Sequence, residues 1–565
     1  MTADNESHLA KLKKQLVPVM WHVGAVGFFI NLLILPVSLY SLQVFDRVMA
    51  TGSLSTLFWL TIVMLLFFVV AGALQSLRGL MLIRASEWLY ENLAMRALPI
   101  TLSQAVLNHG GKGAQSLRDA YALKQFLSGP GPVTLMDAPW SVLYIAIMFL
   151  FHPLLGVLIT CGAVSLICLA WLNETLMKKP MREAGAQQIR STQELEFATR
   201  NADVIEAMGM AHTLIARWKG FYGKASTLQN QAAGRSAIIQ GVTKCVRLTL
   251  QVLVTGVSAW LALEGQVTVG VIIAASILAS RALAPFETAI ASWKALSDGR
   301  QAYARLEETF VADTREEGIS LPEPEGRISV ENLAYVATGG SVILRNINFR
   351  IEDGDVLGII GPSGSGKTTL ARLMTGILKP SGGIVRLDGA NVYTWPREEF
   401  GNYMGYLPQD VELFDGTVKE NIARLKPDAP DNLIIEAAQL AGAHELILRL
   451  PQGYETRIGV GGSVLSAGQR QRIGLARALY GSPRVLVLDE PDASLDDAGK
   501  QALIFALQQA KLKRITTLVI THHQSILAHV DRLLMLRNGT VEAFGPKAQV
   551  ISAIQEARKA QVAAS

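Results

Sequence analysis

Two long stretches without Asp, Glu, Lys or Arg limit what this chain can fold into more than any other feature. Residues 21–45 and 48–77 are uncharged over 25 and 30 positions. About 20 apolar residues cross a hydrocarbon core of ~30 Å as a helix, so each stretch is long enough to span a membrane. A buried core helix of a soluble protein is the alternative, and runs of this length argue against it.

Other uncharged stretches predict four more spans. Residues 138–173 are too many for one crossing, and His152-Pro153 in their middle predicts a turn between two spans. Residues 248–263 and 265–280 are shorter and predict a fifth and a sixth span. The expected spans are residues 21–45, 52–77, 136–151, 153–173, 246–264 and 266–285, within a membrane domain over residues 1–310.

Lysine and arginine are distributed unevenly between the expected loops. The N-terminal tail and the long segments after the second and fourth spans are basic, with ten Lys or Arg from Lys178 to Lys244. The turns on the opposite side hold only Arg47. Because basic loops stay in the cytoplasm, we expect a multi-pass protein with both termini cytoplasmic. The opposite turns are too short to fold into a domain.

Charge and cysteine content narrow the class of protein further. A net charge of +5 over 565 residues argues against a nucleic-acid binder. The three cysteines, Cys161, Cys168 and Cys245, exclude a disulfide framework. Residues 1–310 hold 25 Lys and Arg with 18 Asp and Glu, which leaves 27 and 29 for the other 255 residues. This more charged part predicts a linker at 311–327 and a water-soluble domain at 328–565.

A phosphate-binding loop is predicted near the start of the soluble domain. Residues 356–360 have strand character and precede a G-x-x-x-x-G-K-[ST] pattern, followed by a helical pattern from Thr369. Its residues are Gly361, Pro362, Ser363, Gly364, Ser365, Gly366, Lys367 and Thr368. In such a loop backbone N–H groups surround the phosphates. Lys367 is expected to reach the β- and γ-phosphates of ATP, and the Thr368 hydroxyl to bind Mg²⁺.

Two acids follow a second apolar strand, residues 485–488. In P-loop enzymes the acid that closes this strand holds Mg²⁺, which here is Asp489. The next acid, Glu490, is placed to polarise the attacking water. An apolar strand that ends in two acids is weak evidence on its own. Its position after a P-loop makes it specific for a P-loop enzyme. The sequence predicts an α/β P-loop ATPase.

The string Leu465-Ser466-Ala467-Gly468-Gln469 resembles the LSGGQ signature of ABC transporter ATPases, with Ala467 in place of the middle glycine. The resemblance implies a six-span α-helical exporter domain fused to the α/β ATPase domain. It also implies a homodimer in which each ATP lies between the P-loop of one chain and Ser466 and Gly468 of the other.

Further positions match this family. The resemblance implies that Gln409 binds Mg²⁺ and contacts the membrane domain, and that His522 contacts the γ-phosphate. It also places Asp496 in the loop that follows Asp489 and Glu490 in this family and counts it among the ATP-binding residues. His523 is the alternative to His522. Lys367, Glu490 and His522 together are expected to be catalytic.

Two positions fit the family pattern poorly. Val460 stands in the segment before the signature where an acid is usual. Tyr335 is close to the place of the adenine-stacking aromatic, with an imperfect spacing to Ile343-Leu344, and a core or surface tyrosine is an equal alternative.

Motifs in the membrane domain resemble type I secretion transporters, in the subgroup that exports proteases, lipases and repeat toxins. They are residues 44–48, Asp137-Ala138-Pro139-Trp140, residues 151–156 and residues 205–210. The alternative is that these strings only pack helices, with Asp137 as a helix cap.

The resemblance implies a bacterial inner-membrane exporter surrounded by membrane lipid. Its cargo is then an unfolded polypeptide with a C-terminal signal, and its partners are a periplasmic adaptor and an outer-membrane channel. A multidrug or lipid exporter, and an ATP-driven sensor that moves nothing, remain alternatives.

Overall fold

The structure, a computed structural model, describes residues 8–107, 115–311, 320–337 and 339–564. The chain divides into two compact units, Met1–Asp313 and Thr314–Ser565, called here the N-terminal and the C-terminal unit. Much of the expected linker, residues 312–319, lies outside the described residues. Residues 320–327 contain no helix or strand.

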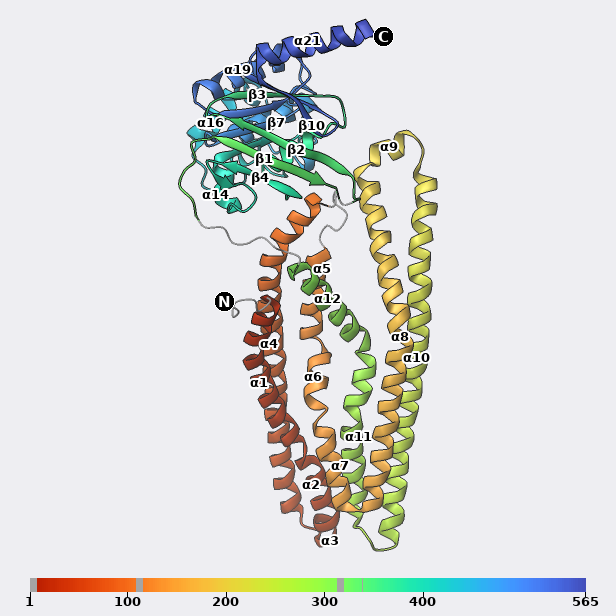
Figure 1. Ribbon diagram of the computed structural model, residues 1–565. Helices are drawn as coiled ribbons and strands as arrows, with labels where there is room; N and C mark the ends of the chain where they lie inside the picture. Colours follow the sequence, from red (N-terminus) through yellow and green to blue (C-terminus); the bar gives the residue numbers. More distant parts are fainter. Residues whose placement is uncertain (1–7, 108–114, 312–319, 338, 565) are drawn as a thin grey trace. The chain divides into compact units, whose positions relative to one another are not determined.

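The N-terminal unit is entirely helical in its described part (Figure 1). Its elements are α1 (His8–Ile34), α2 (Pro36–Gln43), the π-helical turn η1 (Val44–Val48), α3 (Met49–Thr51), α4 (Leu54–Leu107), α5 (Gln115–Ser128), α6 (Pro130–Asp137), α7 (Trp140–Phe151), α8 (Pro153–Arg200), α9 (Ala202–Ala207), α10 (Ala211–Leu263), α11 (Val269–Ala291) and α12 (Trp293–Val311). Six segments of the described residues are long and apolar enough to cross a membrane. They are Leu9–Thr51, Leu54–Ser103, Pro130–Phe151, Pro153–Arg200, Ala211–Leu263 and Val269–Ala291.

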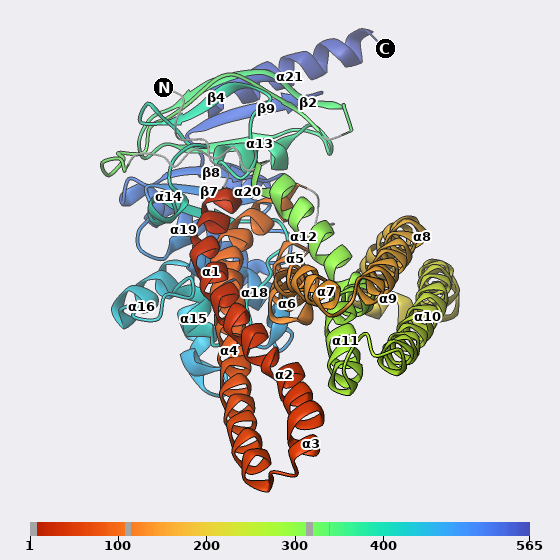
Figure 2. The ribbon, with the colours of Figure 1, turned by 90° about the horizontal axis from the view of Figure 1, so that it is seen from below.

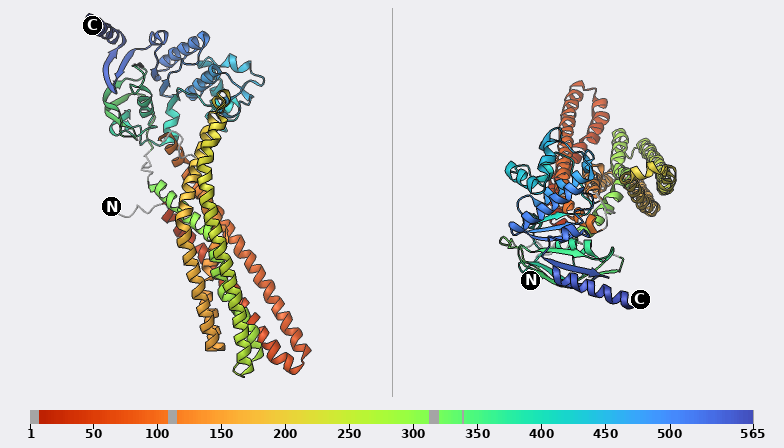
Figure 3. Two further views of the ribbon diagram at one scale, coloured as in Figure 1. Left: turned by 90° about the vertical axis from the view of Figure 1, so that its right-hand side faces the viewer. Right: turned by 90° about the horizontal axis from the view of Figure 1, so that it is seen from above.

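Three of these helices are much longer than a membrane is thick. α4, α8 and α10 have 54, 48 and 53 residues. At 1.5 Å per residue each is about 70–80 Å long, more than twice the hydrocarbon core. The basic segment 178–244 therefore continues α8 and α10 as helix, and these two run side by side (Figure 3, left).

The turn expected at His152-Pro153 is present. His152 has an extended backbone between α7 and α8, and its Nδ1 accepts a hydrogen bond from the Leu154 amide at 3.2 Å. Pro153 at the first position of α8 suits this start because proline has no N–H to leave unpaired there.

Polar side chains join the helices of the N-terminal unit near Asp137. α1 and α4 lie side by side, and α6 contacts α1 (Figure 2). The Arg78 guanidinium donates to both oxygens of Asp137 at 3.0 and 3.2 Å, and Asn31 donates to Asp137 at 3.0 Å. Asp137 ends α6, and the N-cap of α7 is Pro139 without a side-chain bond, so the capping alternative for Asp137 is wrong.

A second polar contact joins η1 to the start of α11. The Asp46 carboxylate accepts hydrogen bonds from the Gly270 amide at 2.7 Å and from the Thr268 hydroxyl at 2.5 Å. The amide at the beginning of α11 is thus bound by a side chain from another span, which satisfies a donor that the helix itself leaves free.

The C-terminal unit contains two sheets and surrounding helices (Figure 1). Its strands are β1 (Ile328–Val336), β2 (Val342–Ile351), β3 (Val356–Ile360), β4 (Gly382–Leu387), β5 (Ala390–Asn391), β6 (Met404–Leu407), β7 (Val485–Asp489), β8 (Thr516–Ile520), β9 (Arg532–Arg537) and β10 (Thr540–Pro546). One sheet has the order β2-β1-β4-β5 and the other β10-β9-β3-β8-β7-β6. The helices are α13 (Lys367–Met374), α14 (Arg397–Tyr403), α15 (Val418–Ile422), α16 (Asp431–Leu440), α17 (His444–Leu448), α18 (Ala467–Leu479), α19 (Asp497–Leu512), α20 (Gln524–Leu527) and α21 (Lys547–Ala564), with short 3-10 turns η2 (Gly453–Glu455) and η3 (Val460–Gly462).

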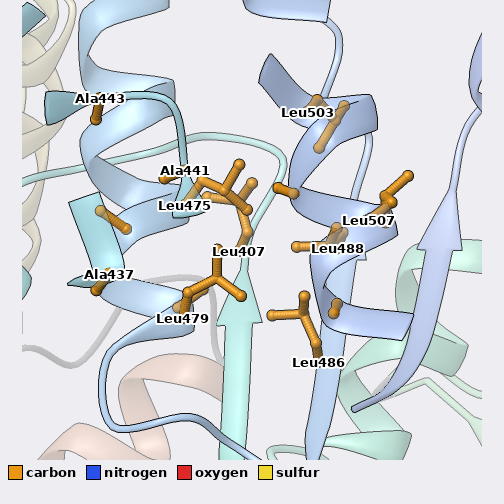
Figure 4. Close-up of a cluster of buried hydrophobic side chains, with 14 of the residues drawn as sticks. Leu407, Ala437, Ala441, Ala443, Leu475, Leu479, Leu486, Leu488, Leu503 and Leu507 are labelled. Atoms are coloured by element: carbon orange, nitrogen blue, oxygen red, sulfur yellow. The ribbon is translucent and has the colours of Figure 1, made fainter. Parts of the chain in front are cut away.

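The larger sheet is covered by helices and supplies the core of the unit. All residues of β7 and β8 are buried, as expected for parallel strands with both faces covered. Figure 4 shows Leu407, Leu486 and Leu488 between leucines of α18 and α19. This packing holds the carboxyl ends of the parallel strands in place.

Candidate functional site

The residues predicted to bind nucleotide follow neighbouring strands of the larger sheet. β3 pairs with β8, β8 with β7, and β7 with β6, all in parallel. The P-loop follows β3, His522 follows β8, Asp489 and Glu490 close β7, and Gln409 follows β6. Parallel strands end at the same edge, which is where open α/β sheets bind ligands.

The predicted P-loop has the backbone that its glycines permit. Gly364 and Gly366 have φ of 78° and 98°, in the left-handed region that other residues avoid. A Cβ on Gly366 would also lie 2.6 Å from Leu344 Cδ2. α13 begins at Lys367, within the last two residues of this loop, so the N–H groups of its first turn belong to the loop, an arrangement suited to binding an anion.

Lys367 and Ser365 are both buried in the loop. The Lys367 ammonium donates to the carbonyls of Gly361 and Pro362 at 2.8 and 3.0 Å. The Ser365 hydroxyl is buried and has no hydrogen-bond partner among the described residues. A buried hydroxyl without a partner is uncommon, and a phosphate oxygen is a suitable acceptor for it.

Asp489 has a free oxygen of the kind that a cation binds. The Thr368 hydroxyl donates to Asp489 Oδ1 at 3.3 Å, whereas Oδ2 is buried without a partner in the described part of the chain. Burial, with a smaller contribution from Glu490, raises the pKa of Asp489 above its ordinary value of 3.8. The hydroxyl and carboxylate oxygens are ligands that Mg²⁺ prefers, so these residues fit the ion.

Glu490 is held in an unusual backbone conformation and contacts Gln409. Its φ is 48°, in a region that a non-glycine residue enters at a cost in energy and that is common at functional sites. Gln409 Nε2 donates to Glu490 Oε2 at 2.8 Å, and the Glu490 amide donates to the Ile520 carbonyl at 3.0 Å.

Gln471 supports the same segment and was missed by the sequence reasoning. Its side chain is buried and donates to the Pro491 carbonyl at 3.0 Å and, more weakly, to the Glu490 carbonyl at 3.5 Å. The residue stands two positions after the signature string, but a glutamine in a helix carries no sequence signal of its own.

The two histidines after β8 are both exposed, and neither imidazole has a hydrogen-bond partner among the described residues. The Thr521 hydroxyl accepts from the His523 amide at 3.0 Å and donates to Asp492 at 2.9 Å. The choice of His522 over His523 therefore stays a prediction.

Ser466, Gly468 and Asp496 form a separate group at the starts of α18 and α19. Ser466 and Gln469 make a reciprocal capping box, and Asp496 caps α19 through the Gly499 amide at 2.8 Å. The groups adjoin, because a Cβ on Gly468 would lie 3.0 Å from the Ser494 carbonyl. Among the described residues no hydrogen bond or ion pair links Ser466, Gly468 or Asp496 to the P-loop.

The two positions that fit the family poorly stay open. Tyr335 is half-buried in β1, opposite Leu344 of β2, and packs on the core of the unit. Nothing in its surroundings decides whether it stacks on adenine. Val460 begins η3, and its side chain lies outside the described residues.

Comparison with known proteins assigns both units. The family "ABC transporter transmembrane region" matches residues 21–285, and the family "ABC transporter" matches residues 344–493. The chain is 40% identical over 538 residues to the type I secretion system ATP-binding protein PrsD of Rhizobium meliloti (strain 1021), covering 94% of this chain and 92% of that protein. It is 26% identical to the exotoxin translocation ATP-binding protein PaxB of Pasteurella aerogenes, covering 96% and 77%.

A solved structure confirms the fold. The chain superimposes on a bacterial Atm1-family ABC exporter with ATP bound, with a TM-score of 0.78, 20% identity, and coverage of 97% of this chain and 98% of the other. At this identity the likeness concerns the fold alone. Both family matches, together with the relative that is 40% identical over almost its full length, show that the chain belongs to the ABC transporter family, among the ATP-binding proteins of type I secretion.

Proposed function

We propose that this chain is the inner-membrane exporter of a type I secretion system and uses ATP hydrolysis to move an unfolded polypeptide out of the cytoplasm. The observation that carries the proposal is the 40% identity to a type I secretion ATP-binding protein over 94% of the chain. Both termini would be cytoplasmic, with a membrane domain at 1–310, a linker at 311–327 and an ATPase domain at 328–565.

The roles of the site residues follow from the geometry of the sheet edge. The loop from Gly361 to Thr368 would surround the phosphates of ATP, with Lys367 moving from its loop carbonyls to the β- and γ-phosphates. Thr368, Asp489 and Gln409 would hold Mg²⁺, which neutralises phosphate charge when bound. Glu490 would orient the water that attacks the γ-phosphate, and His522 would contact that phosphate, so that ATP and water give ADP and phosphate.

A homodimer would complete each site. Ser466, Gly468 and Asp496 adjoin one another and make no polar contact with the P-loop of their own copy within the described residues. A second copy placed head to tail would bring them to the other side of the nucleotide. The closed two-fold arrangement would give two ATP sites and twelve spans.

The other partners follow from the membrane domain. The helical spans on the side of Asp46 are joined by short connections such as residues 264–268, which leave no room for a folded external domain. A periplasmic adaptor and an outer-membrane channel would therefore supply the conduit beyond the membrane. Membrane lipid would surround the exposed apolar helices, and a net charge of +5 over 565 residues argues against nucleic acid as a partner.

The test is secretion of a reporter with a cognate C-terminal segment from cells that make the transporter, the adaptor and the channel. We expect reporter in the medium with the wild type and none with Glu490→Gln, at equal amounts of transporter in the membrane. ATPase activity of the purified dimer in lipid that responds to lipophilic drugs or lipids, and to no secreted polypeptide, would favour the multidrug or lipid alternative.

A further inference from the structure

Arg281 is an exposed cation in the middle of a membrane-spanning helix. From Gly270 to Glu287, all residues of α11 except Arg281 are buried or half-buried. The Arg281 guanidinium makes no hydrogen bond or ion pair with any residue that the structure describes. An ionised side chain at this depth is costly in lipid and is a feature of sites that transport or bind polar ligands.

The position of Arg281 along α11, with the span taken as Val269–Ala291, argues against a lipid headgroup as its partner. Arg281 stands 12 residues after Val269, where α11 begins, which corresponds to about 18 Å along the helix axis. This is near the centre of a hydrocarbon core of ~30 Å. An arginine side chain reaches a headgroup only from near the end of a span, so the guanidinium needs water or a polar ligand at this depth.

Three acids within or next to the spans already have partners. Within or next to the spans, Asp46 binds the start of α11, and Asp137 pairs with Arg78. Glu287 pairs with Arg247 at 2.8 Å. A second copy offers the same residues by symmetry, so it supplies no free carboxylate from these positions to Arg281 either.

The helix face around Arg281 presents polar groups of both kinds. Ala284 and Thr288 share the face of Arg281 by helical spacing, and Thr288 carries a hydroxyl. Pro285 lies four residues after Arg281 and has no N–H, so the Arg281 carbonyl lacks its usual helical donor. The site thus offers guanidinium donors beside a backbone acceptor, which suits an extended polypeptide.

We propose that Arg281 of each copy faces the path of the exported polypeptide and binds its Asp and Glu carboxylates, so that the exporter favours acidic segments. The inference rests on the proposed export function and names the class of cargo. A guanidinium binds a carboxylate with two parallel hydrogen bonds, and the low dielectric of a membrane-enclosed path strengthens them.

The test uses the full-length dimer in lipid vesicles and two synthetic peptides of equal length, one with several Asp and Glu and the other with Asn and Gln at those positions. We expect the acidic peptide to alter the ATPase rate at about tenfold lower concentration than its neutral counterpart, the effect of roughly one charge-assisted contact. Arg281→Gln should abolish this preference, Arg281→Lys should retain most of it, and Arg281→Glu should reverse it, each measured as the ratio of the two peptide concentrations within one variant.

The control is Arg84→Gln, which removes an exposed arginine from the part of α4 beyond the expected span. It should keep the preference for the acidic peptide. Equal preference in the wild type and Arg281→Gln would overturn the inference while leaving polypeptide export intact. If no peptide alters the rate and no reporter is secreted by the wild type, the proposed function itself fails, and this inference with it.

A second measurement does not depend on transport. Arg281→Cys, in a chain whose Cys161, Cys168 and Cys245 are replaced by serine, should react with a charged, membrane-impermeant thiol reagent because the residue faces water. A cysteine in place of Val252, an apolar side chain that is 72% exposed on α10 and is expected to face lipid, should stay unreactive. Protection of Arg281→Cys from the reagent at all stages of the ATP cycle would contradict the inference.

Discussion

Gln409 donates a hydrogen bond from Nε2 to Oε2 of Glu490 at 2.8 Å, which joins the segment after β6 to the acid that closes β7. Glu490 has φ of 48°, and its amide is bound to Ile520 of β8. Glu490 is thus bonded from both sides, through its carboxylate by Gln409 and through its backbone amide by β8. A displacement of Gln409 would remove the hydrogen bond to the proposed catalytic carboxylate without any change in the P-loop.

Replacing Glu490 tests its chemical role. Glu490→Gln keeps the size of the side chain and removes the negative charge, so the purified dimer should bind ATP and hydrolyse it at least about 100-fold more slowly. Phosphate release and retained nucleotide are the measurements. Glu412→Gln, a change of an exposed acid outside the site, should hydrolyse ATP like the wild type. Turnover by Glu490→Gln within about twofold of the wild type would remove Glu490 from the catalytic residues.

Lys367 is expected to affect binding rather than the chemical step alone. Lys367→Ala removes the buried ammonium that now bonds Gly361 and Pro362, so nucleotide affinity should fall by more than about tenfold. Equilibrium binding of a fluorescent ATP analogue measures this directly. The exposed Lys379 serves as the control, and Lys379→Ala should bind the analogue normally. Normal affinity in Lys367→Ala would contradict the role given to the loop.

The raised pKa of Asp489 predicts how stability depends on pH and magnesium. Because the folded pKa exceeds 3.8, the folded unit binds more protons than the unfolded chain in the range above 3.8, and stability falls as pH rises through that range. Asp489→Asn lacks this penalty. Without Mg²⁺ near pH 7 it should unfold roughly 2–4 °C higher than the wild type, about 1 kcal/mol for a unit of this size.

The same variant should lose the response to magnesium. Mg²⁺ with ATP should stabilise the wild type much more than Asp489→Asn, because the ion binds the ionised carboxylate. Calorimetry of the full-length protein at several pH values gives both results, with the exposed Asp428→Asn as control. A lower midpoint for Asp489→Asn at neutral pH without Mg²⁺ would show that its charge stabilises the unit.

The ion pair between Arg78 and Asp137 predicts a large loss of stability from a single change. Asp137→Ala leaves the Arg78 guanidinium, with a side chain 4% exposed, without its carboxylate. The expected loss is about 3–5 kcal/mol. Exchanging both residues together, as Arg78→Met with Asp137→Leu, should restore much of it. The pair Arg217–Glu194, whose side chains are 67% and 21% exposed, is the control, and Glu194→Ala should lose about 1 kcal/mol or less. The temperature at which the purified protein aggregates measures the stability of each variant. Equal losses of stability in Asp137→Ala and Glu194→Ala would contradict the prediction.

The contact between Asp46 and α11 is tested by adding one carbon. A Cβ on Gly270 would lie 2.7 Å from Asp46 Oδ2, so Gly270→Ala must displace the carboxylate. Losing this bond at the start of α11 should destabilise the unit by about 0.5–2 kcal/mol. Asp46→Ala should have a similar effect, and the double variant should add little. The control is Gly256→Ala, whose added Cβ meets no atom within 4 Å and which should leave the stability unchanged. If the losses of Gly270→Ala and Asp46→Ala add up in the double variant, the two residues do not act through this contact.

Local patterns in the sequence determined the six apolar segments, the turn at His152, and the strand and helix on either side of the P-loop. These depend on the length of a hydrophobic run or on the residues of a single loop, so neighbours in the chain suffice to predict them. The extension of α4, α8 and α10 beyond the membrane agrees with the helical pattern of the cytoplasmic segments. Where each helix ends was decided only by the structure, because charged helical turns beyond a membrane have no hydrophobic signal. The sequence also left open whether Asp137 is a helix cap.

Only the tertiary structure decided the partners of the polar side chains. Asp137 meets Arg78 across 59 positions, and Asp46 meets the amide of Gly270 across 224. Gln409 reaches Glu490 because β6 pairs with β7, while Arg281 makes no hydrogen bond or ion pair among the described residues although other charges lie in the same domain. A charge in the sequence signals only that it needs a partner; which group satisfies it depends on how helices and strands pack.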